Sequence, residues 1–255
     1  MPFAAGINYR TYQEDESTPV VLLHGAGGSQ LSWSPQIRRL SGYRVYALDL
    51  PGHGKSRGGG EQSIPAYTRC VLEWMDSIEL NHAIFVGHSM GGAIAQSMAL
   101  DFPKHVLGLG LISTASNLTV NPQLLEETAS AEKFRSAIEK IIAWSFDPAC
   151  PPRLMELVTR RLAETRPGVL YGDLIACNGF DMTEHISEII RPTLVVCGAN
   201  DKMTPPRNAQ SLASRIPGAH LEVIPAAGHM VMLEKPQAVA DVLARFFMNI
   251  HDQSQ

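Results

Sequence analysis

Two copies of the pattern Gly-x-Ser-x-Gly are the first feature of the chain that could carry chemistry. They occupy residues 87–91 and residues 54–58. Ser89 of the first copy follows a continuous apolar run and precedes small residues that can open a helix. A strand, sharp turn and helix in this order would expose a serine hydroxyl, and flanking glycines would relieve crowding in the strained turn. The sequence therefore predicts Ser89 as a nucleophile, whereas Ser56 of the second copy lies in a glycine-rich loop with no helix behind it.

A serine nucleophile needs a base to accept its proton, and that base needs an acid to orient it. Among the nine histidines, His229 lies in a loop that follows the apolar run ending at Ile224. Asp201 follows another apolar run, which ends at Gly198. Open α/β sheets place their sites at the carboxyl ends of strands, so these loops should meet. We therefore predict a triad of Ser89, Asp201 and His229.

Acyl transfer also requires hydrogen-bond donors for the negative charge that develops on the carbonyl oxygen. The backbone N–H of Met90 would lie at the start of the helix after Ser89, where the helix dipole favours an anion. A second donor would come from the glycine-rich segment at residues 24–28, which follows an early apolar run. We predict an oxyanion hole formed by the N–H groups of Ala26 and Met90.

The elements that must hold these residues are predicted from short apolar runs alternating with helical patterns. Most of the runs are continuous, as expected for strands buried on both faces of a parallel sheet. They cover residues 19–25, 43–50, 83–87, 106–113, 193–198 and 220–224, and helical patterns cover residues 93–100 and 238–247. Residues 7–13 alternate more, which predicts an antiparallel edge hairpin with the strand at Pro19. The alternation of strands and helices predicts an α/β fold.

This alternation stops between about residues 115 and 188. No buried strand is predicted there, and the stretch is predicted to form four helices at residues 122–132, 134–144, 152–164 and 168–177, punctuated by prolines and a glycine. Sheet strands lie on both sides of it, so it is predicted to be an insertion into one domain. The predicted division is a core of residues 1–114 and 189–255, with a helical cap at residues 115–188.

Taken together, the motifs resemble those of the α/β-hydrolase fold. They are residues 24–28, 49–56, 87–92, 198–201 and 227–229, so the resemblance covers nearly the whole chain. It implies a mostly parallel eight-stranded sheet with helices on both faces. It also implies that the insertion after the sixth strand is a cap over the active site. The second Gly-x-Ser-x-Gly would then belong to a structural loop of the family. We expect Trp33, Trp144, Phe180 and Met230 to line the substrate pocket, although cap aromatics can equally hold the cap together.

Composition limits the remaining possibilities. The 255 residues are 45% hydrophobic and carry 21 Lys and Arg against 25 Asp and Glu, a net charge of −4. This balance gives no reason to expect a nucleic-acid partner, and no apolar run is long enough to span a bilayer. Four widely separated cysteines and the absence of a signal-peptide pattern predict a cytoplasmic protein with reduced thiols. We expect no metal, no cofactor and no membrane partner, and a monomer or small homo-oligomer.

The predicted function is hydrolysis of small to medium carboxylic esters through an acyl-enzyme. Enzymes that resemble this chain but displace halide or open epoxides use aspartate at the position of Ser89, so the serine argues against these activities. Lyases of menaquinone synthesis typically carry an arginine where Ala93 stands, and carbon–carbon hydrolases often carry an asparagine where His88 stands. An enol-lactonase or a C–C bond hydrolase stays open as an enzymatic alternative. A hydrolase-like ligand receptor with slow turnover is the alternative from another class.

Overall fold

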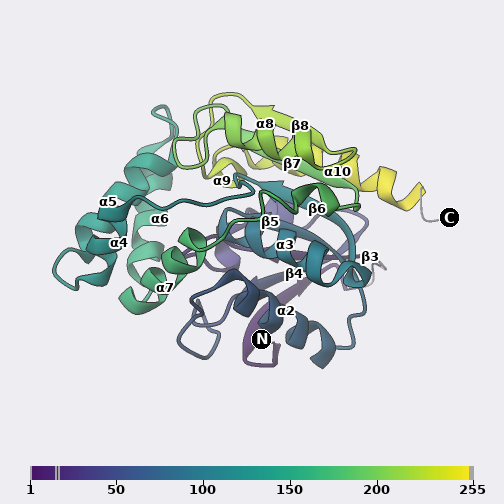
Figure 1. The fold of residues 1–255 in the computed structure, drawn as a ribbon, viewed down its shortest axis with the longest axis horizontal. Helices are drawn as coiled ribbons and strands as arrows, with labels where there is room; N and C mark the ends of the chain where they lie inside the picture. The colour runs from purple at the N-terminus through teal and green to yellow at the C-terminus, as the bar shows by residue number, and fades with distance from the viewer. Residues whose placement is uncertain (1, 15, 17, 253–255) are drawn as a thin grey trace.

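A single eight-stranded sheet forms the centre of the computed structural model, which describes residues 2–14, 16 and 18–252 (Figure 1). The strand order is β1-β2-β4-β3-β5-β6-β7-β8. The strands are β1 (Phe3–Ala4), β2 (Ile7–Tyr12), β3 (Thr18–Leu23), β4 (Tyr43–Asp49), β5 (Ala83–His88), β6 (Val106–Ile112), β7 (Thr193–Gly198) and β8 (His220–Ile224). The order reverses direction between β3 and β5, which is the position where open α/β sheets form a crevice.

The sheet is parallel from β3 to β8, and β1 and β2 form its antiparallel edge. This confirms the predicted mostly parallel sheet. The predicted pairing of residues 7–13 with the strand at Pro19 was wrong, because β2 pairs with β4 instead. The reason is that β3 already has β4 on one side and β5 on the other, so neither of its edges is free.

Helices cover both faces of the sheet, and alternate residues of each strand serve opposite faces. Val21 and Leu23 of β3 pack with α2 (Ile64–Ser77), α3 (Met90–Asp101) and α8 (Pro206–Arg215). Val20 and Leu22 pack on the other face with α1 (Pro35–Arg38), α9 (Val231–Glu234) and α10 (Pro236–Asp252). All six residues of β3 are buried, which explains why the strand reads as a continuous apolar run.

Four helices lie together at one end of the molecule, on the left in Figure 1. They are α4 (Pro122–Ala129), α5 (Phe134–Ser145), α6 (Pro152–Ala163) and α7 (Pro167–Asn178), and the chain forms them between β6 and β7. We call them the cap helices. They share their own apolar cluster, which includes Leu124, Ile138 and Leu174. The division of the chain into core and cap at residues 115 and 188 stays our interpretation.

None of the helices within the described residues combines the length and the apolar character needed to cross a lipid bilayer.

Candidate active site

Ser89 sits on a strained turn between β5 and α3. Its backbone has φ 50° and ψ −113°, a region that residues with a side chain rarely adopt. The turn is tight: a Cβ at Gly87 would lie 2.1 Å from the Gly91 carbonyl oxygen, and one at Gly91 would lie 2.1 Å from that of Leu23. Only glycine fits at either position, and the serine side chain is directed out of the sheet at its carboxyl edge.

His229 and Asp201 form a buried pair beyond the ends of β8 and β7. The Nδ1 of His229 lies 2.9 Å from Oδ2 of Asp201, and the Thr204 hydroxyl donates to the same oxygen at 2.9 Å. The other carboxylate oxygen accepts the backbone N–H groups of Met203 and Thr204, both at 2.9 Å. Burial opposes the charge of Asp201, but His229 and these donors outweigh it and hold the pKa of Asp201 below its usual value. The carboxylate therefore keeps Nδ1 of His229 protonated and leaves Nε2 to accept a proton.

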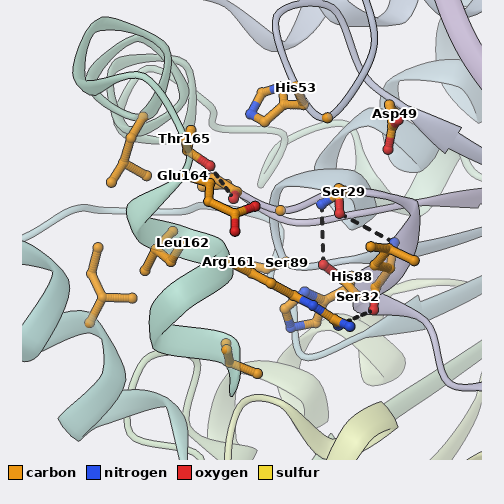
Figure 2. Close-up of a pocket in the computed structure, with 18 of the residues that line it drawn as sticks. Ser29, Ser32, Asp49, His53, His88, Ser89, Arg161, Leu162, Glu164 and Thr165 are labelled. Atoms are coloured by element: carbon orange, nitrogen blue, oxygen red, sulfur yellow. Dashed lines mark hydrogen bonds between the residues drawn. The ribbon is translucent and has the colours of Figure 1, made fainter. Parts of the chain in front are cut away.

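A cavity of about 580 Å³ contains the surfaces of Ser89, His229 and Ala26. The cap helices supply its opposite wall with side chains that include Ile142, Leu162 and Leu174. In Figure 2, Ser89 and His88 lie in the middle of this pocket, and Leu162 of α6 and Thr165 just after α6 lie on the cap side. A volume of this size accommodates a small or medium organic ligand.

The two predicted oxyanion donors are backbone N–H groups that are not used in hydrogen bonds elsewhere in the part of the chain that the structure describes. In the segment after His24, the N–H of Gly27 donates to Asp173 and the N–H of Gly28 donates to Gly25. The N–H of Ala26, one residue before Gly27, has no acceptor within the described residues. The N–H of Met90 belongs to the first turn of α3, where helices leave such groups unpaired. Both donors are therefore available to a ligand, and their role stays a prediction.

Of the four residues predicted to line the pocket, Met230 does so and the other three lie elsewhere. Trp33 is fully buried in the cluster beneath α1 and α10. Trp144 packs against the apolar cluster of the cap helices. Phe180 joins the cluster on the face with α2 and α3 and borders a separate cavity of about 140 Å³. These aromatic side chains are used for packing, which a sequence pattern does not distinguish from ligand contact.

Two other histidines near the site are neutral and bond the backbone. Burial, reinforced by His229, lowers the pKa of His88 to about 3, and its Nε2 donates to the His229 carbonyl at 3.0 Å. Burial likewise lowers the pKa of His24 to about 3. Its Nδ1 donates to the Gly25 carbonyl at 2.8 Å and its Nε2 accepts the Leu50 N–H at 3.0 Å. His88 thus supports the loop of the predicted base, and His24 supports the predicted oxyanion segment.

The second Gly-x-Ser-x-Gly has a structural role. The Ser56 hydroxyl donates to the Asp49 carbonyl and accepts the N–H of Asn8 at 2.7 Å. The Asp49 carboxylate accepts the N–H groups of Gln30 and Lys55, at 2.8 and 3.1 Å. The Ser56 hydroxyl therefore holds the loop after β4 to β2.

Metal-ligating side chains are not clustered in the part of the chain that the structure describes: no three His, Cys, Asp or Glu residues there could hold one ion. All four cysteines are free thiols.

Comparison with known proteins places this geometry in context. A family model described as "Alpha/beta hydrolase family" matches residues 20–242. The chain is 31% identical over 237 residues to the dihydrolipoyllysine-residue acetyltransferase component of the acetoin cleaving system from Pseudomonas putida, covering 90% of this chain and 63% of that protein. It is 28% identical to a pimeloyl-[acyl-carrier protein] methyl ester esterase from Yersinia enterocolitica, over 89% of this chain and 92% of that protein. The crystal structure of the enol-lactonase from Burkholderia xenovorans LB400 superposes with a TM-score of 0.90 at 23% identity, covering 97% of this chain and 100% of that one.

Proposed function

The chain belongs to the alpha/beta hydrolase family, and we propose that it hydrolyses carboxylic esters through an acyl-enzyme on Ser89. One observation carries the proposal. Ser89, on its strained turn, opens into the same cavity as His229, whose Nδ1 is bound to the buried carboxylate of Asp201. Nucleophile, base and orienting acid in this relation are the requirements of acyl transfer.

In the acylation step, the Oγ of Ser89 attacks the ester carbonyl carbon while Nε2 of His229 takes the hydroxyl proton. The carbonyl π electrons move onto oxygen, and the N–H groups of Ala26 and Met90 stabilise that negative charge. Asp201 stabilises the imidazolium through Nδ1. When the intermediate collapses, the carbon–oxygen bond to the alcohol breaks, and the alcohol leaves with the proton from His229.

In the deacylation step, water takes the place of the alcohol. His229 accepts a proton from the water as its oxygen attacks the acyl carbon, and the same two N–H groups hold the second oxyanion. The bond between Ser89 and the acyl group then breaks, and His229 returns the proton to the serine oxygen. The products are a carboxylic acid and the original enzyme.

The substrate class follows from the cavity. A volume of about 580 Å³ suits esters with small or medium acyl and alcohol groups, and its cap side presents the apolar side chains Ile142, Val158 and Leu170. The Yersinia relative is named as a methyl ester esterase, which supports ester hydrolysis as the reaction class. The enol-lactonase resembles this chain in fold, and lactones therefore belong in the test.

The test is a panel of p-nitrophenyl esters of increasing acyl length, assayed beside a lactone of similar size. We expect sustained turnover of the shorter esters by the wild type and a loss of at least about 10⁴-fold in Ser89→Ala. Ser56→Ala is the matched control, because it removes the serine of the other Gly-x-Ser-x-Gly, and it should retain turnover within about threefold. Unchanged turnover in Ser89→Ala would refute the proposal.

Other outcomes separate the alternatives. Faster hydrolysis of the lactone than of every ester would favour a lactonase that uses the same triad. A single burst of one product per enzyme without further turnover would favour a slow-turnover receptor.

A further inference from the structure

A buried polar cluster joins the cap helices to the core beside the active site. Asp173 of α7 is fully buried, and its carboxylate accepts three hydrogen bonds from the core. The Tyr67 hydroxyl donates to Oδ1 at 2.5 Å. His53 Nε2 and the backbone N–H of Gly27 both meet Oδ2 at 2.8 Å. A buried carboxylate is costly unless its lone pairs are satisfied in this way.

His53 balances the charge of Asp173 in this cluster when its ring is protonated. Its Nδ1 faces the Pro51 carbonyl at 3.0 Å and its Nε2 faces Asp173, so both ring nitrogens point at acceptors. Burial disfavours the imidazolium, but the Asp173 carboxylate and the hydrogen bonds outweigh it, and the pKa of His53 is raised above its usual value. The link between α7 and the core is therefore an ion pair when His53 is protonated, and both side chains are shielded from water by the surrounding protein.

Gly27 is held by the cap on its other side as well. The Thr165 hydroxyl, between α6 and α7, donates to the Gly27 carbonyl at 2.8 Å, and Figure 2 shows this bond reaching from the cap to the loop. Gly27 has φ +64°, and a Cβ there would lie 2.5 Å from Cδ1 of Leu162 and 3.0 Å from Cδ1 of Leu170. The N–H and the carbonyl of Gly27 are thus both hydrogen-bonded to cap residues. The cap leucines leave no space for a side chain at this position.

We propose that Asp173 and Thr165 are positioning residues that couple docking of the cap helices to the geometry of the oxyanion hole. The inference rests on the proposed function, because Gly27 directly follows Ala26, whose N–H is the predicted donor. The two peptide groups after that N–H are fixed by the cap, one through Asp173 and one through Thr165. The cap therefore does more than close the cavity.

The physical reason is the short range of an oxyanion donor. Such a donor acts when it lies about 2.7–3.1 Å from the developing charge, and it must be held there before the reaction. Gly27 has a left-handed φ and no side chain, so without these contacts its backbone would be free to change conformation. Releasing either contact should let the Ala26 N–H rotate away from the carbonyl oxygen.

Two substitutions release the contacts separately. Thr165→Val removes the donor to the Gly27 carbonyl while keeping the shape of a half-buried side chain. Asp173→Asn removes the charge that receives the Gly27 N–H. Thr165→Ser restores the hydroxyl and is the rescue variant. Thr159→Val is the matched control, since the Thr159 hydroxyl donates only to the Met155 carbonyl of its own helix, at 2.7 Å.

The first measurement is steady-state turnover of a short ester. We expect kcat to fall about tenfold in Thr165→Val and about 10²-fold in Asp173→Asn with KM nearly unchanged, because the lost interaction is made in the transition state. Thr165→Ser should recover kcat to within about threefold, and Thr159→Val should match the wild type. A rise in KM alone in Thr165→Val would mean that Thr165 contacts substrate, and it would overturn the positioning role.

The second and third measurements do not depend on finding the right ester. Amide hydrogen exchange at Gly27, followed by NMR, should accelerate at least tenfold in Thr165→Val and in Asp173→Asn but not in Thr159→Val. Phosphonylation of Ser89 by a fluorophosphonate, which places a phosphoryl oxygen in the oxyanion hole and expels fluoride, should slow in the same order as kcat.

The outcomes separate this inference from the proposed function. Unchanged Gly27 exchange and unchanged phosphonylation in correctly folded Thr165→Val would overturn the positioning role even if esters are hydrolysed. Faster exchange and slower phosphonylation, in a protein that turns over no ester, would uphold the positioning role and refute the esterase proposal.

Discussion

Replacing Asp201 by asparagine should invert the hydrogen-bond direction at His229, the proposed catalytic base. The two carboxylate oxygens are not equivalent, since Oδ1 accepts the backbone N–H groups of Met203 and Thr204 at 2.9 Å each. Two fixed donors demand an acceptor, so the amide oxygen of Asp201→Asn will occupy this position. The amide nitrogen then takes the place of Oδ2, which lies 2.9 Å from Nδ1 of His229.

An amide nitrogen there donates to Nδ1 and forces the proton of the neutral imidazole onto Nε2. That tautomer has no lone pair directed toward Ser89, so it cannot accept the hydroxyl proton. Loss of the correct tautomer in a Ser–His–Asp arrangement costs about 10⁴ in kcat, which is about 5.4 kcal/mol at about 1.36 kcal/mol per tenfold. Because asparagine has the same shape as aspartate, the fold should be retained.

The assay is steady-state hydrolysis of a short p-nitrophenyl ester, and the rate of Ser89→Ala is subtracted as the background. The ¹⁵N chemical shifts of the His229 ring, measured on the same protein, report which nitrogen is protonated. A kcat for Asp201→Asn within tenfold of the wild type would refute the tautomer reasoning. So would ¹⁵N shifts that place the proton on Nδ1 in this variant.

Three further predictions concern stability, thiol chemistry and substrate charge. The raised pKa of His53 means that its ion pair stabilises the fold fully below about pH 6.5 and loses this contribution as pH rises through the folded-state pKa. Urea midpoints of the wild type should therefore fall more steeply above neutral pH than those of His53→Gln, and parallel curves would contradict this. Burial raises the pKa of Cys150 and Cys197 to about 11. Iodoacetamide at pH 7.5 should therefore label them far more slowly than free cysteine and leave ester turnover unchanged. Rapid labelling would show accessible thiolates and contradict this. Arg161 and Lys55 line the cavity, so an ester with a remote carboxylate should show a KM up to about fivefold lower than its neutral isostere, with the difference lost in 0.5 M salt. Equal KM values at low salt would rule out this charge effect.

The turn around Ser89 and the strands were predictable because their signals are local. Gly87 and Gly91 lie within two residues of Ser89, and the turn leaves no space for a Cβ at either. The buried strands are continuous apolar runs because helices cover both faces of the sheet. Three of the four helices between β6 and β7, α4, α6 and α7, were likewise marked by prolines at their starts.

Contacts between distant segments were not predictable in this way. Residues 7–13 were correctly predicted as a strand, but the predicted partner was wrong, because pairing depends on which sheet edges the other strands leave free. Trp33 has the size and polarity of a pocket residue, yet packing beneath α10 uses it for the core. Nothing in a local pattern separates these two uses of an aromatic ring.

The sequence by itself determined the positions of Ser89, Asp201 and His229 after their strands, because each residue follows an apolar run and has its own turn residues. Only the tertiary structure decided how the cap meets the core. Asp173 lies 146 residues from Gly27 along the chain, and a lone aspartate in a helix carries no sign of its partner. Folding buries this carboxylate, and burial makes every hydrogen bond to it necessary.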